Sequence, residues 1–376
     1  MERRRFVLAA LVLLVGLAVA SCSDSPIIIG YSATLKGKYS DLGVQGRNGA
    51  LLAIEEINAA GGVDGRKLEL LVRDDGNTPE GAIKADTELL AAGASVILGH
   101  MTSAQSMAAL EKFKDSEVVY LSPTTSTDLL QGKKDNFFRV ISTLTDLARS
   151  LARHSVGSMG SKRMAVVWDR SNAPFTGPYK DSFLETFREN GGEVVGEVGY
   201  ESSKGPVDWQ GIVDQLKGMQ PDSVVVACAA RDLAAFAQHL RLNGVDWNLF
   251  SSMWGYTKEL IQTGGKSVEG IVFAVHFVED RPEPGYAEFE ERFISRFGWA
   301  PNFAAVFSYE AVRVFVHAVK KNGGSTKGLD KVLPGMVFEG TIIGTYELDD
   351  FGDVKREGHI VKVKDGEFVT VTREAQ

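Results

Sequence analysis

Hydroxyl side chains gather at two places in the sequence, each directly after a short apolar run. Thr102 and Ser103 follow the run 95–99, and a second cluster that includes Thr124 and Ser126 follows the run 118–121. Where such a cluster opens a helix, the free N–H groups of the first turn and the hydroxyl donors together suit a carboxylate. Serine and threonine are also the commonest helix caps. Two clusters at the ends of successive strands nevertheless favour a ligand site over simple capping.

The common catalytic and cofactor-binding motifs are absent from the sequence. It contains no phosphate-binding GxxxxGK[ST] loop, no GxGxxG after a first strand, no GxSxG elbow and no HExxH pair. The six histidines are scattered, and none pairs with another at metal-ligand spacing. Cys228 lies in an apolar stretch with no histidine nearby, and we expect it to be a small buried side chain. The sequence therefore predicts a binding protein rather than an enzyme, with neither a metal site nor a cofactor.

The composition is that of a folded chain that does not bind nucleic acid. Apolar residues make up 44% and charged residues 24% of the 376 residues, as in ordinary globular proteins. Mean hydropathy is −0.06, which excludes a polytopic membrane protein. The 41 Lys and Arg against 49 Asp and Glu leave a formal charge of −8. A nucleic-acid partner requires a basic face, so this balance argues against one.

Strand-like and helix-like runs alternate along the chain, and the pattern restarts near its middle. Such alternation predicts parallel sheets with helices on both faces, here as two α/β units with a crossover near 141–145. The first unit is expected to hold strands at 26–31, 67–74, 95–99 and 118–121 and helices at 48–58, 79–92 and 104–114. The second is expected to hold strands at 163–168, 193–200, 223–227, 248–251 and 270–276, helices at 177–190, 209–217 and 232–243, and two final helices at 286–297 and 307–321.

The N-terminus has the form of a secretory signal. Three arginines precede an apolar run over 6–20, which is shorter than the roughly 20 residues of a membrane-spanning helix. The run ends in Val-Ala-Ser-Cys, which resembles the lipobox of bacterial lipoproteins. We predict that residues 1–21 are a signal peptide and that Cys22 carries lipid, which would tether the protein to a membrane without spanning it. The alternative is ordinary signal cleavage with Cys22 as a bystander.

Four segments resemble the periplasmic leucine/isoleucine/valine-binding proteins, which are the type I solute-binding proteins of branched-chain amino acid ABC transporters. They are GRNGALLAIEEINAAGGVDGRKLELLVRDD from Gly46, VILGHMTS from Val96, LSPTTS from Leu121 and AVVWD from Ala165. The resemblance covers essentially the whole chain after the signal segment. It implies two lobes joined by three crossovers that close on a ligand. Lobe one is expected to comprise residues 26–142 and 275–352, and lobe two residues 143–274 and 353–376.

The resemblance also implies roles for the hydroxyl residues of lobe one. Ser103 falls where the family uses a serine hydroxyl and amide for the ligand carboxylate. Thr124 falls where a backbone carbonyl accepts from the ligand ammonium, and Ser126 falls where a threonine serves both groups. The family's frequent disulfide in lobe one is missing, with Asn77 and Thr102 at its positions.

Other positions expected at the ligand depart from the family pattern. Leu42 stands where a tyrosine is expected, Phe175 replaces a second aromatic without its hydroxyl, and Ala229 replaces a third. Trp254 occupies the position of the acid that pairs with the ammonium. Phe175 and Trp254, together with Trp168, are expected to form either core packing or an apolar wall for the ligand. A buried ammonium without an anion is costly, so Asp232 or Glu201 is expected to supply the missing charge.

These observations predict a lipid-anchored solute-binding protein of an ABC importer, located in the periplasm or cell envelope. Its partners would be the permease and ATPase subunits and the membrane that holds the anchor. The ligand expected first is a branched-chain or other apolar amino acid. The alternatives are an amide, a short carboxylate or an aromatic acid, favoured by the missing acid, and a sensory module that feeds a signalling partner.

Overall fold

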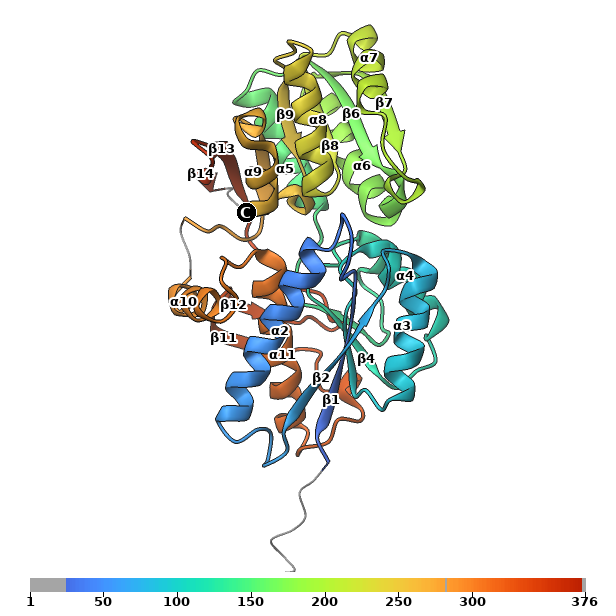
Figure 1. Ribbon diagram of the computed structural model, residues 1–376, viewed down its shortest axis with the longest axis vertical. Helices are drawn as coiled ribbons and strands as arrows, with labels where there is room; N and C mark the ends of the chain where they lie inside the picture. Colours follow the sequence, from blue (N-terminus) through green and yellow to red (C-terminus); the bar gives the residue numbers. More distant parts are fainter. Residues whose placement is uncertain (1–24, 281–282, 374–376) are drawn as a thin grey trace, which may run out of the picture.

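Two β-sheets, each with its own helices, organise the protein into two lobes (Figure 1). The computed structural model describes residues 25–280 and 283–373. Lobe one contains a parallel five-stranded sheet in the order β2-β1-β3-β4-β5, and lobe two a seven-stranded sheet in the order β14-β13-β10-β9-β8-β6-β7. The predicted α/β class with two lobes is confirmed, whereas the residue ranges at which the lobes divide remain a prediction.

In lobe one, the strands of the main sheet run parallel, and all but the edge strand β2 are buried. Its strands are β1 (Ile27–Ala33), β2 (Leu68–Asp74), β3 (Val96–Gly99), β4 (Val119–Ser122) and β5 (Phe137–Arg139). Its helices are α2 (Asp41–Ala59), α3 (Pro79–Ala91), α4 (Ser103–Lys112), α10 (Tyr286–Phe297) and α11 (Phe303–Lys321). A hairpin of β11 (Val337–Thr341) and β12 (Gly344–Glu347) packs on α11, where Phe338 contacts the ring of His317.

In lobe two, five parallel strands carry two antiparallel strands at one edge. The strands are β6 (Arg163–Asp169), β7 (Glu193–Tyr200), β8 (Ser223–Ala227), β9 (Asn248–Ser251), β10 (Val272–Val275), β13 (His359–Lys364) and β14 (Glu367–Arg373). The helices are α5 (Thr145–Gly157), α6 (Ala173–Glu189), α7 (Trp209–Met219), α8 (Ala230–Leu242) and α9 (Lys258–Gly264). Strands such as β8, with every residue buried, read as continuous apolar runs because helices cover both faces.

Strand order decides where a ligand can bind. In lobe one the chain moves from β1 to β2 and then back past β1 to β3. In lobe two it moves from β6 to β7 and back past β6 to β8. Because such crossovers are right-handed, the reversal sends consecutive helices to opposite faces and opens a crevice at the carboxyl ends of the strands. Each lobe therefore has one such crevice.

Helix α2 begins seven residues earlier than the sequence pattern predicted, at Asp41 rather than Asn48. Glycines interrupt the apolar periodicity there, and Gly43 is the clearest case. A Cβ on Gly43 would lie 1.9 Å from the carbonyl oxygen of Thr34. Close packing of the helix on the preceding loop, rather than helix propensity, thus sets the start of α2. The sequence pattern also missed α5, α9, β5 and the four strands β11 to β14.

Three segments connect the lobes, at 140–144, 276–285 and 349–358, of which residues 281–282 are outside the described structure. The imidazole of His276 in the second segment lies between the other two. Its Nδ1 is 3.1 Å from the carbonyl oxygen of Glu357 and its Nε2 is 3.2 Å from that of Thr143. Burial lowers the pKa of His276 to about 4, so the ring is neutral near pH 7. A neutral ring has one N–H and donates to one of these two segments at a time.

Candidate functional site

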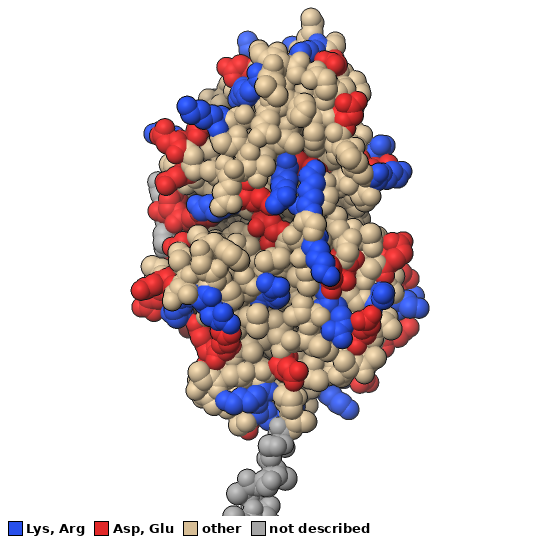
Figure 2. Space-filling model, viewed as in Figure 1, with Lys and Arg blue, Asp and Glu red and all other residues tan. Residues whose placement is uncertain are grey.

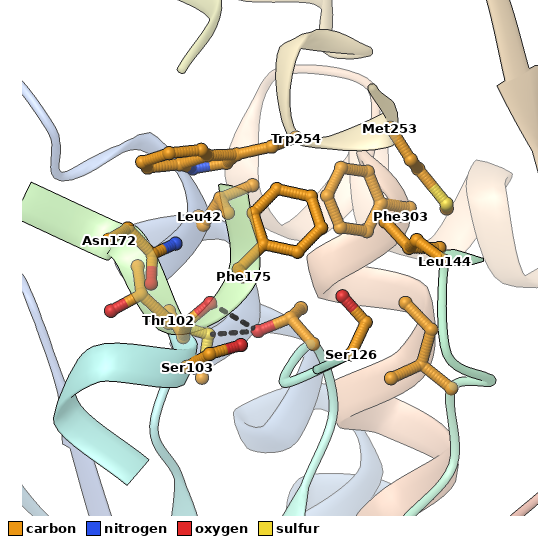
Figure 3. Close-up of a pocket in the computed structure, with 13 residues that line it drawn as sticks. Leu42, Thr102, Ser103, Ser126, Leu144, Asn172, Phe175, Met253, Trp254 and Phe303 are labelled. Carbon is orange, nitrogen blue, oxygen red and sulfur yellow. Dashed lines mark hydrogen bonds between the residues drawn. The ribbon is translucent and has the colours of Figure 1, made fainter. Parts of the chain in front are cut away.

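A pocket lies between the two lobes, at the carboxyl ends of both sheets (Figure 3). We call it the first compartment, and its empty volume is about 330 Å³. Loops after β1, β3 and β4 contribute from lobe one, and the loops after β6 and β9 contribute from lobe two. The lining residues are Leu42, Met101, Thr102, Ser103, Thr124, Ser126, Ile141, Leu144, Asn172, Phe175, Met253, Trp254 and Phe303. Seven of the eight predicted ligand residues are therefore brought together, and that they bind a ligand remains a prediction.

The loop between β3 and α4 is held in place by Gly99. This residue has φ +141°, and a Cβ on it would lie 2.2 Å from the carbonyl oxygen of Ser32, so a larger residue could not be accommodated. Helix α4 then begins at Ser103 with Thr102 as its N-cap, but no side-chain hydrogen bond caps the helix. The Thr102 hydroxyl is buried without a partner. Capping therefore does not account for the first hydroxyl cluster.

The second hydroxyl cluster divides into structural and pocket-lining members. Thr124 donates to the carbonyl oxygen of Met101 at 2.8 Å, which ties the two strand-end loops together. Thr127 accepts from the N–H of Leu129 at 3.1 Å, as a cap does. Ser126, only 6% exposed, lines the pocket beside Ser103 (Figure 3). The capping interpretation holds for Thr127, while Ser126 lines the pocket and its role in ligand binding remains a prediction.

Aromatic side chains form the opposite side of the first compartment. The rings of Phe175 and Trp254 lie edge to face with centroids 6.0 Å apart, a favourable aromatic arrangement. Phe303 and Leu42 extend this apolar surface from lobe one (Figure 3). Trp168 does not contribute to the lining, and the ammonium of Lys180 lies 5.1 Å from its ring centroid instead.

Asn172 lines the pocket but was not found from the sequence. Its Oδ1 accepts from the N–H of Ala104 at 3.1 Å, so the lobe-two amide meets the first turn of α4 in lobe one. Asp169 at the end of β6 shapes this loop by accepting from the N–H of Ser171 at 2.9 Å. The signal was present, because the polar run 169–172 follows a strand just as the two hydroxyl clusters do.

The two acids proposed to replace the missing one are both engaged elsewhere, so that prediction is wrong. Asp232 is fully buried and pairs with Lys38. It also accepts from the hydroxyls of Tyr200 at 2.9 Å and Tyr39 at 3.1 Å. Glu201 forms an ion pair with Lys204 at 2.7 Å and lies outside the pocket lining. Among the described residues, no carboxylate lines the first compartment.

The Lys38–Asp232 pair joins lobe one to lobe two and should favour closure. Because Lys38 is 41% exposed, the pair contributes at most about 1 kcal/mol. Lys38→Met is therefore expected to weaken ligand binding about twofold to fivefold through the loss of closed protein. Calorimetric titration and the radius of gyration without ligand would measure this. Lys36→Met, an exposed neighbour, is the control, and equal affinity for both variants would contradict a closing role.

Cys228 is fully buried, as expected from its apolar neighbours. Burial, reinforced by the negative charge of Asp232, raises the pKa of this thiol well above its ordinary value. A protonated, inaccessible thiol is a poor nucleophile. Within residues 25–280 and 283–373, no group of three or more His, Cys, Asp and Glu side chains is arranged to hold a metal ion.

Two α/β lobes with a pocket between the carboxyl ends of their sheets define a bilobal binding protein. The family model described as periplasmic binding protein matches residues 26–367. The chain therefore belongs to the periplasmic binding protein family, which confirms the resemblance seen in the sequence.

Known relatives and solved structures are similar to this protein over nearly its whole chain. Leu/Ile/Val-binding protein homolog 1 of Brucella melitensis is 23% identical, over 97% of this chain and 98% of the relative. The branched-chain amino acid binding protein LivJ of Streptococcus pneumoniae, solved with isoleucine, has a TM-score of 0.83 at 22% identity, over 93% of this chain and 99% of its own. A solute-binding protein of Rhodopseudomonas palustris, solved with 3,4-dihydroxybenzoic acid, has a TM-score of 0.83 at 23% identity. The similarity covers 93% of this chain and 97% of that protein. At these identities the structures establish the fold of this chain.

Proposed function

We propose that this protein is the solute-binding component of an ABC importer and captures a small apolar amino acid between its two lobes. The observation that carries the proposal is the two-sided first compartment. Hydroxyls of Ser103 and Ser126 at the start of α4 and the adjoining loop face an apolar wall that contains Phe175 and Trp254. Helix N-termini and hydroxyls suit a carboxylate, and an apolar wall suits an aliphatic side chain.

A second candidate ligand is an aromatic carboxylate. No carboxylate among the described residues lines the first compartment to pair with an ammonium. The Rhodopseudomonas palustris neighbour was solved with 3,4-dihydroxybenzoic acid, which has a carboxylate and no ammonium. The edge-to-face pair of Phe175 and Trp254 offers an aromatic ring a matching surface.

A thermal-shift screen separates these candidates. Leucine, isoleucine and valine form one set, benzoate and 3,4-dihydroxybenzoate the other, each at up to 100 times its dissociation constant. A ligand at that excess stabilises the folded protein by about 2.7 kcal/mol. A shift with the first set only supports amino acid capture. A shift with the second set only would replace amino acid capture with the aromatic alternative, and no shift with either would contradict both.

We also propose that the protein is held at the cell envelope by lipid on Cys22, with residues 1–21 removed as a signal peptide. These residues lie outside the described structure. No described helix is both long and apolar enough to cross a bilayer. Permease and ATPase subunits are the expected partners of such an anchored binding protein.

Substitution of Cys22 tests the anchor. Cys22→Ala should shift the protein from the membrane fraction to the soluble or unprocessed fraction, because an acyl chain is then no longer attached. Fractionation and mass spectrometry of the N-terminus provide the readout. Cys228→Ala is the matched control, since it removes the other cysteine and leaves the lipobox intact. A native protein with an unmodified N-terminus at another residue would disprove lipidation.

A further inference from the structure

A second compartment adjoins the first, with an empty volume of about 410 Å³. The two share Leu42, Met101, Thr102 and Trp254 in their linings, so a ligand held at Ser103 borders both. The second compartment lies in the groove between the lobes, where acidic and basic side chains gather (Figure 2). Its lining includes the charged side chains of Lys38, Asp41 and Glu259, whereas no charged side chain among the described residues lines the first compartment. Ala229, predicted as a ligand residue, lines this compartment and not the first.

Of the two carboxylates that line the second compartment, Asp41 is the one without an ion-pair partner among the described residues. It is the first residue of α2, and the amide of Asn302 donates to it at 3.0 Å. Within the described residues, no lysine or arginine forms an ion pair with Asp41. Burial and then the negative charge of Glu259 raise the pKa of Asp41 to about 6. Hydrogen bonds from Thr257 and Asn302 and the charge of Arg231 oppose this rise without cancelling it, so a bound cation would further stabilise the ionised carboxylate.

The other charged groups around the compartment are already paired. Glu259 binds Arg231 through its Oε1. Lys38 binds Asp232, which belongs to lobe two and is fully buried. A cation that enters the compartment would therefore meet Asp41 as its available anion.

A buried hydroxyl that lines both compartments gives independent support for a ligand group at this place. The hydroxyl oxygen of Thr102 is buried and has no hydrogen-bond partner among the described residues. An ammonium carries three N–H donors, and the Thr102 oxygen is an acceptor that the protein leaves unused.

We propose that the second compartment receives the ammonium group of the bound amino acid, with Asp41 of lobe one as its counter-ion. The inference rests on the proposed function and deepens it, since it defines the ligand as a zwitterion. Carboxylate and ammonium then bind on two sides of Thr102, the first toward Ser103 and the second toward Asp41. The acid comes from lobe one because, among the described residues, the lobe-two carboxylate that lines either compartment, Glu259, is already paired with Arg231.

Pairs of ligands that differ only in the amino group test this assignment. The probes are leucine with 4-methylpentanoate and valine with 3-methylbutanoate, titrated by calorimetry against the full chain. The parent protein should bind each amino acid at least tenfold more tightly than its des-amino partner. Asp41→Asn should weaken amino acid binding about tenfold to a hundredfold and leave des-amino binding unchanged, because only the charge pair is lost. Glu259→Gln, which alters the carboxylate paired with Arg231, should retain most of the preference.

The pH dependence supplies a second readout. Glu259 on α9, Arg231 on α8, and Lys38 and Tyr39 in the β1–α2 loop are the ionisable groups that face this compartment. Asp41 binds an ammonium only when ionised. With a pKa of about 6, the ionised fraction falls about fourfold from pH 7.5 to 5.5. Leucine affinity of the parent should fall to a similar extent, whereas Asp41→Asn should show no such fall.

The outcomes distinguish this inference from the proposed function. If Asp41→Asn retains the full preference for leucine over 4-methylpentanoate, the counter-ion assignment is wrong while amino acid capture stands. If the parent binds the des-amino acids as tightly as the amino acids, the ligand needs no ammonium and both statements fail. If no member of either pair binds, amino acid capture is wrong and the inference fails with it. Loss of binding for both members in Asp41→Asn, with a lowered melting temperature, would indicate a structural role and also overturn the assignment.

Discussion

Ser103→Ala is expected to weaken ligand binding about tenfold to a hundredfold while the fold remains nearly unchanged. A hydrogen bond to a charged group contributes about 1.5–3 kcal/mol, and about 1.4 kcal/mol is a factor of ten in affinity. Ser103 is 1% exposed, lines the first compartment and begins helix α4. Its hydroxyl does not cap that helix, so the stability cost should be below the roughly 1 kcal/mol of a lost cap.

Calorimetric titration beside melting curves measures both effects, with Ser126→Ala as the companion variant. Ser150→Ala is the matched control, because Ser150 is also a buried helical serine but lies in the middle of α5, outside both compartments. Its variant should bind ligand as tightly as the parent. Unchanged affinity in Ser103→Ala and Ser126→Ala together would show that these hydroxyls have no part in binding.

Asp353→Ala is expected to destabilise the protein by about 3–5 kcal/mol, the usual cost of leaving one partner of a buried ion pair uncompensated. Arg139 at the end of β5 is fully buried, and its Nε donates to Asp353 at 2.7 Å. Burial lowers the pKa of Arg139 and the adjacent Asp353 opposes that shift, so this carboxylate is the main counter-charge of the buried guanidinium. Asp353 also accepts from the N–H of Gly132 at 2.8 Å.

Scanning calorimetry should show the loss as a lower melting temperature of the transition that includes lobe one, by roughly 6–20 °C. Asp146→Ala is the control, since it removes an ion pair with Arg149 in which both side chains are exposed. Such a pair contributes at most about 1 kcal/mol. A loss in Asp353→Ala no larger than in Asp146→Ala would mean that solvent or another group compensates Arg139.

The sequence alone was sufficient for the fold class and for the position of the hydroxyl side of the candidate site. Alternating strand and helix patterns are local, and parallel strands bring their carboxyl ends to one edge of a sheet. The hydroxyls after residues 99 and 121 therefore had to lie near one another, as Ser103 and Ser126 do. The missed strands are short, as β5 is with its three residues, or belong to the antiparallel hairpins β11–β12 and β13–β14, outside the alternating strand and helix pattern.

Only the tertiary structure decided which charges remain available to a ligand. From the sequence, Asp232 was a candidate partner for the ligand ammonium. In the structure, Lys38, 194 positions away, forms an ion pair with it where the lobes meet. Asp41 falls between the strand at 26–31 and the helix at 48–58 expected from the sequence, but it begins α2 and lines the second compartment, and among the described residues no lysine or arginine forms an ion pair with it. Arg139 and Asp353 are 214 positions apart and share one buried site. Helix and strand patterns depend on neighbours along the chain, whereas charge pairing depends on distances in space that closure of the two lobes sets.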